Sequence, residues 1–228
     1  MLPEPIGSDL IDQLTSDCDA SFRTNQDGVL ESGGDGKIYA ARNLIRHVPI
    51  VRDFWQHGFV RTFLINQLGH QFGLVRVLYF DKPPDRTWSL PWHKDTAIAV
   101  KKNNMESNKL TRPTMKAGTP HVIAADDILH HMLTLRVHLD AVTLENGPLK
   151  VIPASHHSSS NEGDDVSAAE TIQARAGEVL AMRPLLTHSS GSSQPGTKLH
   201  RRILHLEFSD QEDLPDSYQW HDFVALSH

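Results

Sequence analysis

The residues best suited to chemistry in this sequence are a histidine and an aspartate one residue apart, His93 and Asp95. Two ligands at positions i and i+2 suit a strand or its end, because alternate side chains of a strand project to the same side. Placed in this way, an imidazole and a carboxylate can bind one metal ion. A third ligand must then come from a distant part of the chain.

Several histidines could supply the third ligand. His188 closes the apolar stretch 177–188 and is followed by a short polar segment, 189–191. The pattern predicts a strand that delivers an imidazole at its end. His156 and His157 open a serine-rich stretch, for which a polar turn with exposed rings is the simpler interpretation. We therefore predict His188 as the third ligand and keep His156 as the alternative.

Two histidines and one carboxylate fill about half of the positions around an octahedral ion, which is the ligand pattern of non-haem Fe(II) oxygenases. The open positions accept a chelating cosubstrate and dioxygen. The same ligands would also suit a cupin-like isomerase or lyase, and a third hypothesis is a barrel that binds a small acid without catalysis. An arginine pair further along the chain favours the oxygenase.

The segment 200–208, which contains Arg201 and Arg202, has the alternation of a strand. After Arg202, its apolar residues alternate with polar ones: Leu204, Leu206 and Phe208 against His205 and Glu207. Arg201 belongs to the polar face, whereas the apolar face should pack against a hydrophobic layer. A guanidinium just beyond the third ligand suits bidentate binding of a carboxylate that extends past the metal. Arg202 is the alternative for this role.

In these features the sequence resembles the phytanoyl-CoA dioxygenase family of Fe(II)/2-oxoglutarate-dependent oxygenases. The matching segments lie in order between about residues 75 and 208: 92–95, 133–140, 145–156, 177–188 and 201–202. Each segment is a weak signal alone, but the combination is specific. Two departures stand out. Ala154 occupies a position at which the family usually has glycine, a mild change if its φ stays negative, and the loop 189–198 carries a small insertion.

The resemblance implies a mainly β protein with flanking helices, built as a double-stranded β-helix (jelly roll, cupin-like barrel). It implies that Fe(II) binds to His93, Asp95 and His188 and that 2-oxoglutarate and O2 are the cosubstrates. Arg201 would bind the far carboxylate of 2-oxoglutarate. Further contacts are expected from Thr134 and Tyr79 to the cosubstrate, and from Trp92, Lys94, Arg136 and His138 to the substrate.

The expected reaction is hydroxylation of a small-molecule substrate with release of succinate and CO2. Asp95 argues against halogenation, in which a halide takes the coordination position left by a missing carboxylate ligand. The sequence does not identify the substrate or the oligomeric state.

Helical elements are expected before the barrel, namely a helix that begins at Ser8 and another over residues 51–68, with turns at 26–28 and 33–36. The first barrel strand is predicted at 75–80. A second strand, 133–140, should direct its polar residues, Thr134, Arg136 and His138, into the barrel. Two polar stretches interrupt the barrel, 101–120 and 158–169, and the first is predicted to be an irregular lid.

Length and composition fit one domain of 228 residues, with helical and turn-rich elements over 1–74 and a jelly-roll core over about 75–208. The net charge of −6 without a dense basic cluster argues against nucleic-acid binding. The absence of an apolar run of about 18 residues argues against membrane insertion, and we expect a cytoplasmic protein. The single cysteine, Cys18, is expected to be a half-buried thiol without a redox role.

Overall fold

Three antiparallel sheets organise the computed structural model, which describes residues 1–24, 29–32, 38–159 and 163–227. The predicted turns at 26–28 and 33–36 lie outside the described residues. The main sheet has the strand order β1-β2-β3-β13-β8-β11, with β14 paired to β3. Its strands are β1 (Val29–Ser32), β2 (Ile38–Ala41), β3 (Gly73–Lys82), β8 (Met132–His138), β11 (Val179–Met182), β13 (Arg201–Ser209) and β14 (Val224–Ala225).

Two smaller sheets complete the β structure. The minor sheet has the order β10-β9-β12-β4 and consists of β4 (Leu90–His93), β9 (Leu149–Val151), β10 (Glu170–Ile172) and β12 (His188–Ser190). The third sheet has the order β5-β7-β6 and consists of β5 (Ala97–Ala99), β6 (Leu110–Lys116) and β7 (Thr119–Ala124).

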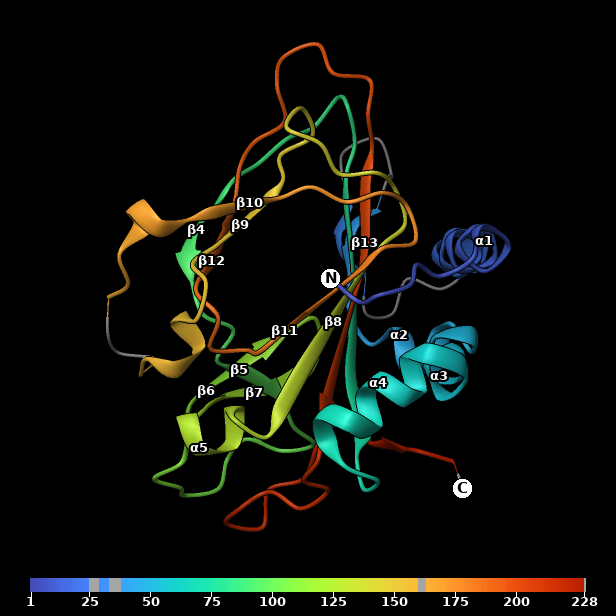
Figure 1. Ribbon diagram of the computed structural model, residues 1–228. Helices are drawn as coiled ribbons and strands as arrows, with labels where there is room; N and C mark the ends of the chain where they lie inside the picture. The colour runs from blue at the N-terminus through green and yellow to red at the C-terminus, as the bar shows by residue number, and fades with distance from the viewer. Residues whose placement is uncertain (25–28, 33–37, 160–162, 228) are drawn as a thin grey trace.

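The helices gather mainly on one side of the main sheet, opposite the minor sheet (Figure 1). They are α1 (Ser8–Thr24), α2 (Leu44–His47), α3 (Ile50–Asp53), α4 (Gly58–Leu68) and α5 (Asp126–Leu129), with short 3-10 turns η1 (Phe54–Gln56), η2 (Ser155–His157) and η3 (Val166–Ala168). The main and minor sheets face each other as the two halves of a jelly roll, so the predicted fold class is confirmed. Within the described ranges, no helix has both the length and the apolar character needed to cross a membrane.

The hydrophobic core lies between the main sheet and helices α1 to α4. Leu204, Leu206 and Phe208 of β13 are fully buried there, together with Leu135 and Val137 of the neighbouring strand β8. The alternation predicted for β13 is therefore confirmed. Its other face, which carries His205 and Glu207, turns toward the minor sheet and lines a cavity.

Two predicted elements are interrupted where the backbone departs from regular geometry. The helix predicted over 51–68 is divided into α3, η1 and α4, because His57 takes an extended conformation at φ −130° and ψ 162°. The strand predicted over 177–188 is divided into β11 and β12. Pro184 lies between the two strands and has no N–H to offer a ladder. His188 therefore begins a strand instead of ending one.

The segment predicted as an irregular lid is largely regular. Residues 110–116 form β6, which pairs with β7 through a turn at Ala117 and Gly118, both with positive φ. Ala154 has φ 62°, in the left-handed region, so the condition of a negative φ at this non-glycine position is not met. Cys18 is fully buried, not half-buried, and burial raises the pKa of its thiol to about 12.

The core face of β13 should carry a large share of the stability. We expect Leu206→Ala to lower the free energy of unfolding by about 2–5 kcal/mol, because a fully buried leucine leaves a cavity that its neighbours fill only in part. Leu144→Ala is the matched control, since Leu144 is 58% exposed, and it should stay within about 0.5 kcal/mol. Urea unfolding monitored by fluorescence measures both, and equal losses would contradict the assigned core.

Candidate metal centre

Three side chains from two distant segments converge on one point. One potential ligand atom from each of His93, Asp95 and His188 lies within 4.8 Å of the others. Asp95 Oδ1 is 3.8 Å from His93 Nε2, and Asp95 Oδ2 is 3.6 Å from His188 Nε2. The two imidazole ring centres are 4.2 Å apart. This donor set and spacing fit a single transition-metal ion with open coordination positions.

Backbone hydrogen bonds orient both imidazoles. His93 Nδ1 lies 2.7 Å from the carbonyl oxygen of Pro91, and His188 Nδ1 lies 2.8 Å from that of Leu186. A carbonyl oxygen can only accept, so each Nδ1 carries the proton and each Nε2 keeps its lone pair for a metal. The two rings are thus held in the tautomer that a metal ligand needs.

The strand pairing places these ligands. His93 at the end of β4 is the direct cross-strand partner of His188 in β12, where cross-strand side chains on one face are close neighbours. Asp95 follows β4, and its backbone N–H donates to the carbonyl oxygen of Pro184 at 2.8 Å. The prediction that His-x-Asp lies at a strand end is confirmed. The other candidate, His156, lies in η2 with its ring 4.0 Å from that of His157.

Asp95 is the electrostatic focus of the site. Its burial opposes ionisation, but the charges of His188, His205, His93 and Arg76 outweigh burial and hold its pKa below the usual range. His205 Nε2 lies 3.8 Å from Asp95 Oδ2 and 3.6 Å from Glu207 Oε1. Burial lowers the pKa of His205 to about 3. Both of its nitrogens are buried without a hydrogen-bond partner.

Two buried arginines face the cavity. Arg201 is 4% exposed and Arg136 is 7% exposed, and the Nε atom of each is buried without a hydrogen-bond partner among the residues that the structure describes. Arg201 Nη1 donates to the carbonyl oxygen of Gly147. Burial lowers the pKa of Arg201 to about 10, and burial together with the charge of Arg201 lowers that of Arg136 to about 9. These groups retain unused donors in a place where an anion would relieve their desolvation.

Arg202 is engaged elsewhere. Its Nε and Nη2 donate to the two carboxylate oxygens of Asp140 at 2.9 and 2.7 Å, and its backbone N–H donates to the same carboxylate at 2.8 Å. Arg202 lies outside the cavity, beside α1 residues such as Asp19 and Arg23. Of the two arginines, Arg201 is the one with a side chain directed into the site.

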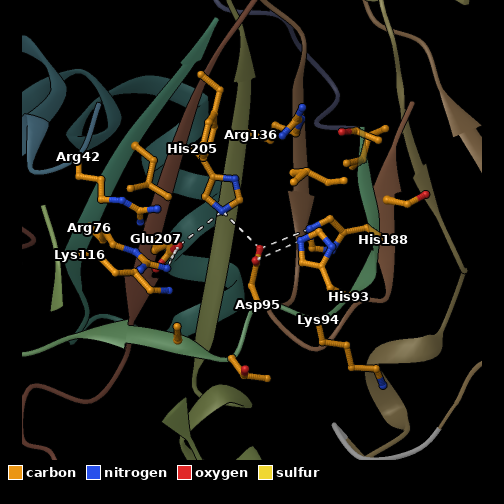
Figure 2. A pocket seen from close by; sticks show the side chains of 18 of the residues that line it. Arg42, Arg76, His93, Lys94, Asp95, Lys116, Arg136, His188, His205 and Glu207 are labelled. Carbon is orange, nitrogen blue, oxygen red and sulfur yellow. Dashed lines mark hydrogen bonds and ion pairs between the residues drawn. The ribbon is translucent and has the colours of Figure 1, made fainter. Parts of the chain in front are cut away.

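The cavity has a volume of about 360 Å³ and includes charged residues that the sequence did not single out as site residues. Arg42, Arg76, Lys116 and Glu207 lie on the side of Asp95 and His205 away from His93 and His188 (Figure 2). Arg76 Nε and Nη2 donate to the Glu207 carboxylate at 2.8 and 2.5 Å. These two residues are direct partners across β3 and β13, so knowledge of the register would have revealed the pair.

Several predicted contacts are corrected by this geometry. Tyr79 lies on the helical face of β3, where its ring packs 4.9 Å from that of Phe22, so we withdraw it as a cosubstrate contact. Trp92 is half-buried and does not line the cavity, whereas Trp88 does. Thr134 and His138 are buried on β8 without lining the cavity, and His138 Nδ1 hydrogen-bonds the Glu178 carbonyl oxygen.

Lys94 and Arg136 both line the cavity but have different surroundings. The Lys94 ammonium donates to three backbone carbonyl oxygens at 3.0 to 3.1 Å, those of Ser155, Ser158 and Ser159. Its side chain therefore holds the loop after η2 and points away from the centre of the cavity (Figure 2). Arg136 is directed into the barrel, as the polar face of β8 predicted.

Comparisons with known proteins agree with this fold. A family model described as phytanoyl-CoA dioxygenase (PhyH) matches residues 18–198. No curated protein matches the chain at a significant level. Three solved structures share this fold at low sequence identity. In each case the structural match extends over most of this chain.

The first is the non-heme alpha ketoglutarate dependent carbocyclase SnoK from nogalamycin biosynthesis, with 14% identity and a TM-score of 0.64 over 92% of this chain and 79% of SnoK. The second is EctD from S. alaskensis with 2-oxoglutarate and 5-hydroxyectoine, with 17% identity and a TM-score of 0.65 over 91% and 70% of the two chains. The third is AviO1 from Streptomyces viridochromogenes Tue57, with 18% identity and a TM-score of 0.62 over 93% and 90%.

Metal binding should depend on the three converging side chains. Fe(II) added anaerobically at a hundredfold excess over its dissociation constant should raise the melting temperature of the wild type by about 5–10 °C. Asp95→Asn and His188→Ala should lose most of this shift, because each removes one of three ligands. His157→Ala is the control and should keep it, since His157 is exposed. Thermal unfolding with and without Fe(II) measures the effect, and a full shift in His188→Ala would return the third-ligand assignment to His156.

Proposed function

The chain belongs to the phytanoyl-CoA dioxygenase family, and we propose that it is an Fe(II)- and 2-oxoglutarate-dependent oxygenase that hydroxylates a small molecule, with release of succinate and CO2. The observation that carries the proposal is the combination of a His-Asp-His cluster with a buried arginine in one cavity. The cluster suits the metal, and the arginine suits the cosubstrate. Either feature alone would be compatible with other chemistry.

The side chains of this protein would hold the metal ion and the cosubstrate and orient them. His93, Asp95 and His188 would hold Fe(II) from one side and leave about half of an octahedron open. When bound, Fe(II) with 2-oxoglutarate supplies the redox chemistry by which O2 is activated and the cosubstrate is decarboxylated to succinate. The fixed Nδ1–H groups of the two histidines keep the ligands in place without rearrangement.

Arg201 would bind the carboxylate of 2-oxoglutarate that is remote from the metal. It lies four residues before His205 on the same strand, and His205 is in contact with Asp95. A strand rises about 3.3 Å per residue, so the Arg201 backbone lies roughly 13 Å along β13 from the level of the metal ligands. A long side chain that reaches back over part of this distance leaves room for a five-carbon diacid. Its unused Nε supplies a donor for a two-point contact.

Arg136 lies beside the metal and not at the far end. It is the direct cross-strand partner of His205; burial and then the charge of Arg201 lower the pKa of Arg136, whereas the charge of Asp95 raises it. A guanidinium in this position would stabilise a second anionic group of the cosubstrate near the ion.

The buried arginine separates this proposal from the alternatives. A cupin-like isomerase or lyase would have no obligatory use for Arg201, and a barrel that only binds a small acid would have no use for an oriented metal ligand set. Hydroxylation is the finer part of the proposal, because the fold also supports a carbocyclase, SnoK. Asp95 completes the ligand set and so favours hydroxylation over halogenation.

Turnover should require iron and 2-oxoglutarate together. The purified protein with Fe(II), ascorbate and 2-oxoglutarate should form succinate, and a metabolite extract that contains the substrate should increase the rate. Zn(II) should give no turnover, because the chemistry needs a redox-active ion although the ligands would accept zinc. Succinate measured by mass spectrometry decides the matter. Full turnover with Zn(II) alone would overturn the oxygenase proposal.

Arg201 and Arg202 should differ sharply in cosubstrate affinity. Arg201→Ala should weaken 2-oxoglutarate binding by roughly thirty-fold or more, since loss of a buried partner for a carboxylate costs about 2–5 kcal/mol. Arg202→Ala should change affinity by no more than about a factor of a few while lowering the melting temperature, because Asp140 loses its partner. Arg201→Lys should restore binding only in part.

The measurement is a titration of the anaerobic Fe(II) protein with 2-oxoglutarate, followed through the metal-to-cosubstrate charge-transfer band. Equal losses of affinity in Arg201→Ala and Arg202→Ala would show that the side-chain orientation on β13 has been misassigned.

A further inference from the structure

A buried lysine lies behind the end of the cavity at which Arg201 is found. Lys82 is the last residue of β3 and the direct cross-strand partner of Arg201 in β13. Its side chain is fully buried, and its Nζ donates to the carbonyl oxygens of Trp88 and Gly191, both at 2.7 Å. Lys82 Nζ also lies 5.2 Å from the centre of the Trp88 ring, which lines the cavity. Lys82 therefore joins two segments that enclose the Arg201 end.

Gly191 also connects Lys82 to the turn that holds Arg201. Arg201 Nη1 donates to the carbonyl oxygen of Gly147. Gly147 has φ 70° and packs so closely on the Gly191 carbonyl oxygen that a Cβ would clash with it, and this Cβ would lie 3.1 Å from Lys82 Nζ. Since Lys82 donates to the same Gly191 oxygen, the contacts form a closed chain around the Arg201 guanidinium.

The charge of Lys82 lies among other positive charges. Burial, followed by the charges of Arg201 on β13 and Arg136 on β8, lowers the pKa of Lys82 to about 7. Among the described residues, the hydrogen-bond partners of the ammonium are the two carbonyl oxygens, and neither is a carboxylate. An anion bound by Arg201 would lie near this group of cations and would favour the charged form of Lys82.

We propose that Lys82 is a positioning residue for the cosubstrate, which fixes Arg201 and Trp88 around the remote carboxylate of 2-oxoglutarate and adds its charge to the attraction. The inference rests on the proposed function, since it concerns the cosubstrate of the same site. Lys82 does not itself line the cavity, so it acts through Arg201 and Trp88 and not by direct contact. Its effect should be confined to ligands that place a carboxylate at this end.

The test compares two keto acids in the anaerobic Fe(II) protein. 2-Oxoglutarate has the remote carboxylate, whereas 2-oxovalerate has the same chain length without it, and both can chelate the metal through the keto acid. The charge-transfer band measures the affinity for each. Lys82→Met removes the charge and keeps the length of the side chain. It should weaken 2-oxoglutarate about tenfold and change the affinity for 2-oxovalerate by less than about twofold. Lys82→Arg, which keeps a charge and donors, should recover most of the affinity for 2-oxoglutarate.

Lys150→Met is the matched control. Lys150 is an exposed lysine in β9, beside the cavity-lining residue Leu149, and does not itself line the cavity. This variant should bind both keto acids as the wild type does. Lys82→Met should keep the melting-temperature shift with Fe(II), which shows that it is folded and binds the metal.

A second measurement needs no variant. Because a carboxylate at Arg201 would raise the lowered pKa of Lys82, binding of 2-oxoglutarate at about pH 7.5 should be accompanied by proton uptake. Its affinity should accordingly fall as the pH rises above about 7. Calorimetry in two buffers with different ionisation enthalpies counts the protons. 2-Oxoglutarate should take up more protons than 2-oxovalerate, which leaves the Arg201 end without an anion.

Each outcome decides for or against the inference. Equal weakening of both keto acids in Lys82→Met, or no weakening of either, would contradict a role at the remote carboxylate while the proposed function stands. If Lys82→Met does not fold, the proton count decides, and equal uptake with the two keto acids would overturn the inference. If the wild type shows no charge-transfer band with either keto acid, the proposed function fails and this inference fails with it.

Discussion

The rest of the structure depends on β13, because the two faces of this strand lie in opposite environments. One face of the strand packs Leu204, Leu206 and Phe208 into the core beneath the helices, while the other carries Arg201, His205 and Glu207 into a cavity. Burial of charge on a central strand is costly unless each charge has a partner. Glu207 has one in Arg76, directly across the pair of strands, with two hydrogen bonds. That pair allows the strand to be polar on one side without loss of the sheet.

The metal ligands depend on register in the same way. His93 and His188 are direct partners across β4 and β12, so one pairing brings both imidazoles to a single ion. A slip of one residue would turn one imidazole to the opposite face. The hydrogen bond from the Asp95 backbone N–H to the Pro184 carbonyl oxygen joins the segment after β4 to the segment before β12. The Pro184 carbonyl oxygen thus holds Asp95 at the site.

What the sequence could predict was local, and what it missed was set by long-range geometry. The His-x-Asp spacing and the alternation of β13 are local patterns with direct physical meaning. Tyr79 was misassigned because the sequence of β3 does not show which of the two faces of this strand lines the cavity. The sequence did not show which backbone carbonyl oxygens Lys94 contacts, because Ser155, Ser158 and Ser159 lie about sixty residues away in the chain. Arg42 and Lys116 come from separate elements, and no spacing in the sequence joins them.

The two adjacent arginines show how stability and function are divided between neighbouring positions. Arg202 has its guanidinium matched by Asp140, with a further backbone hydrogen bond to the same carboxylate, so its charge is compensated and its contribution is to the fold. Arg201 is more deeply buried and has an Nε without a partner, which in the absence of an anion costs free energy. A buried guanidinium with an unsatisfied donor binds an anion more strongly, because the anion offsets a desolvation cost that folding has already incurred. The alternation of β13 therefore decides that Arg202 stabilises the fold and that Arg201 is directed to the anion site.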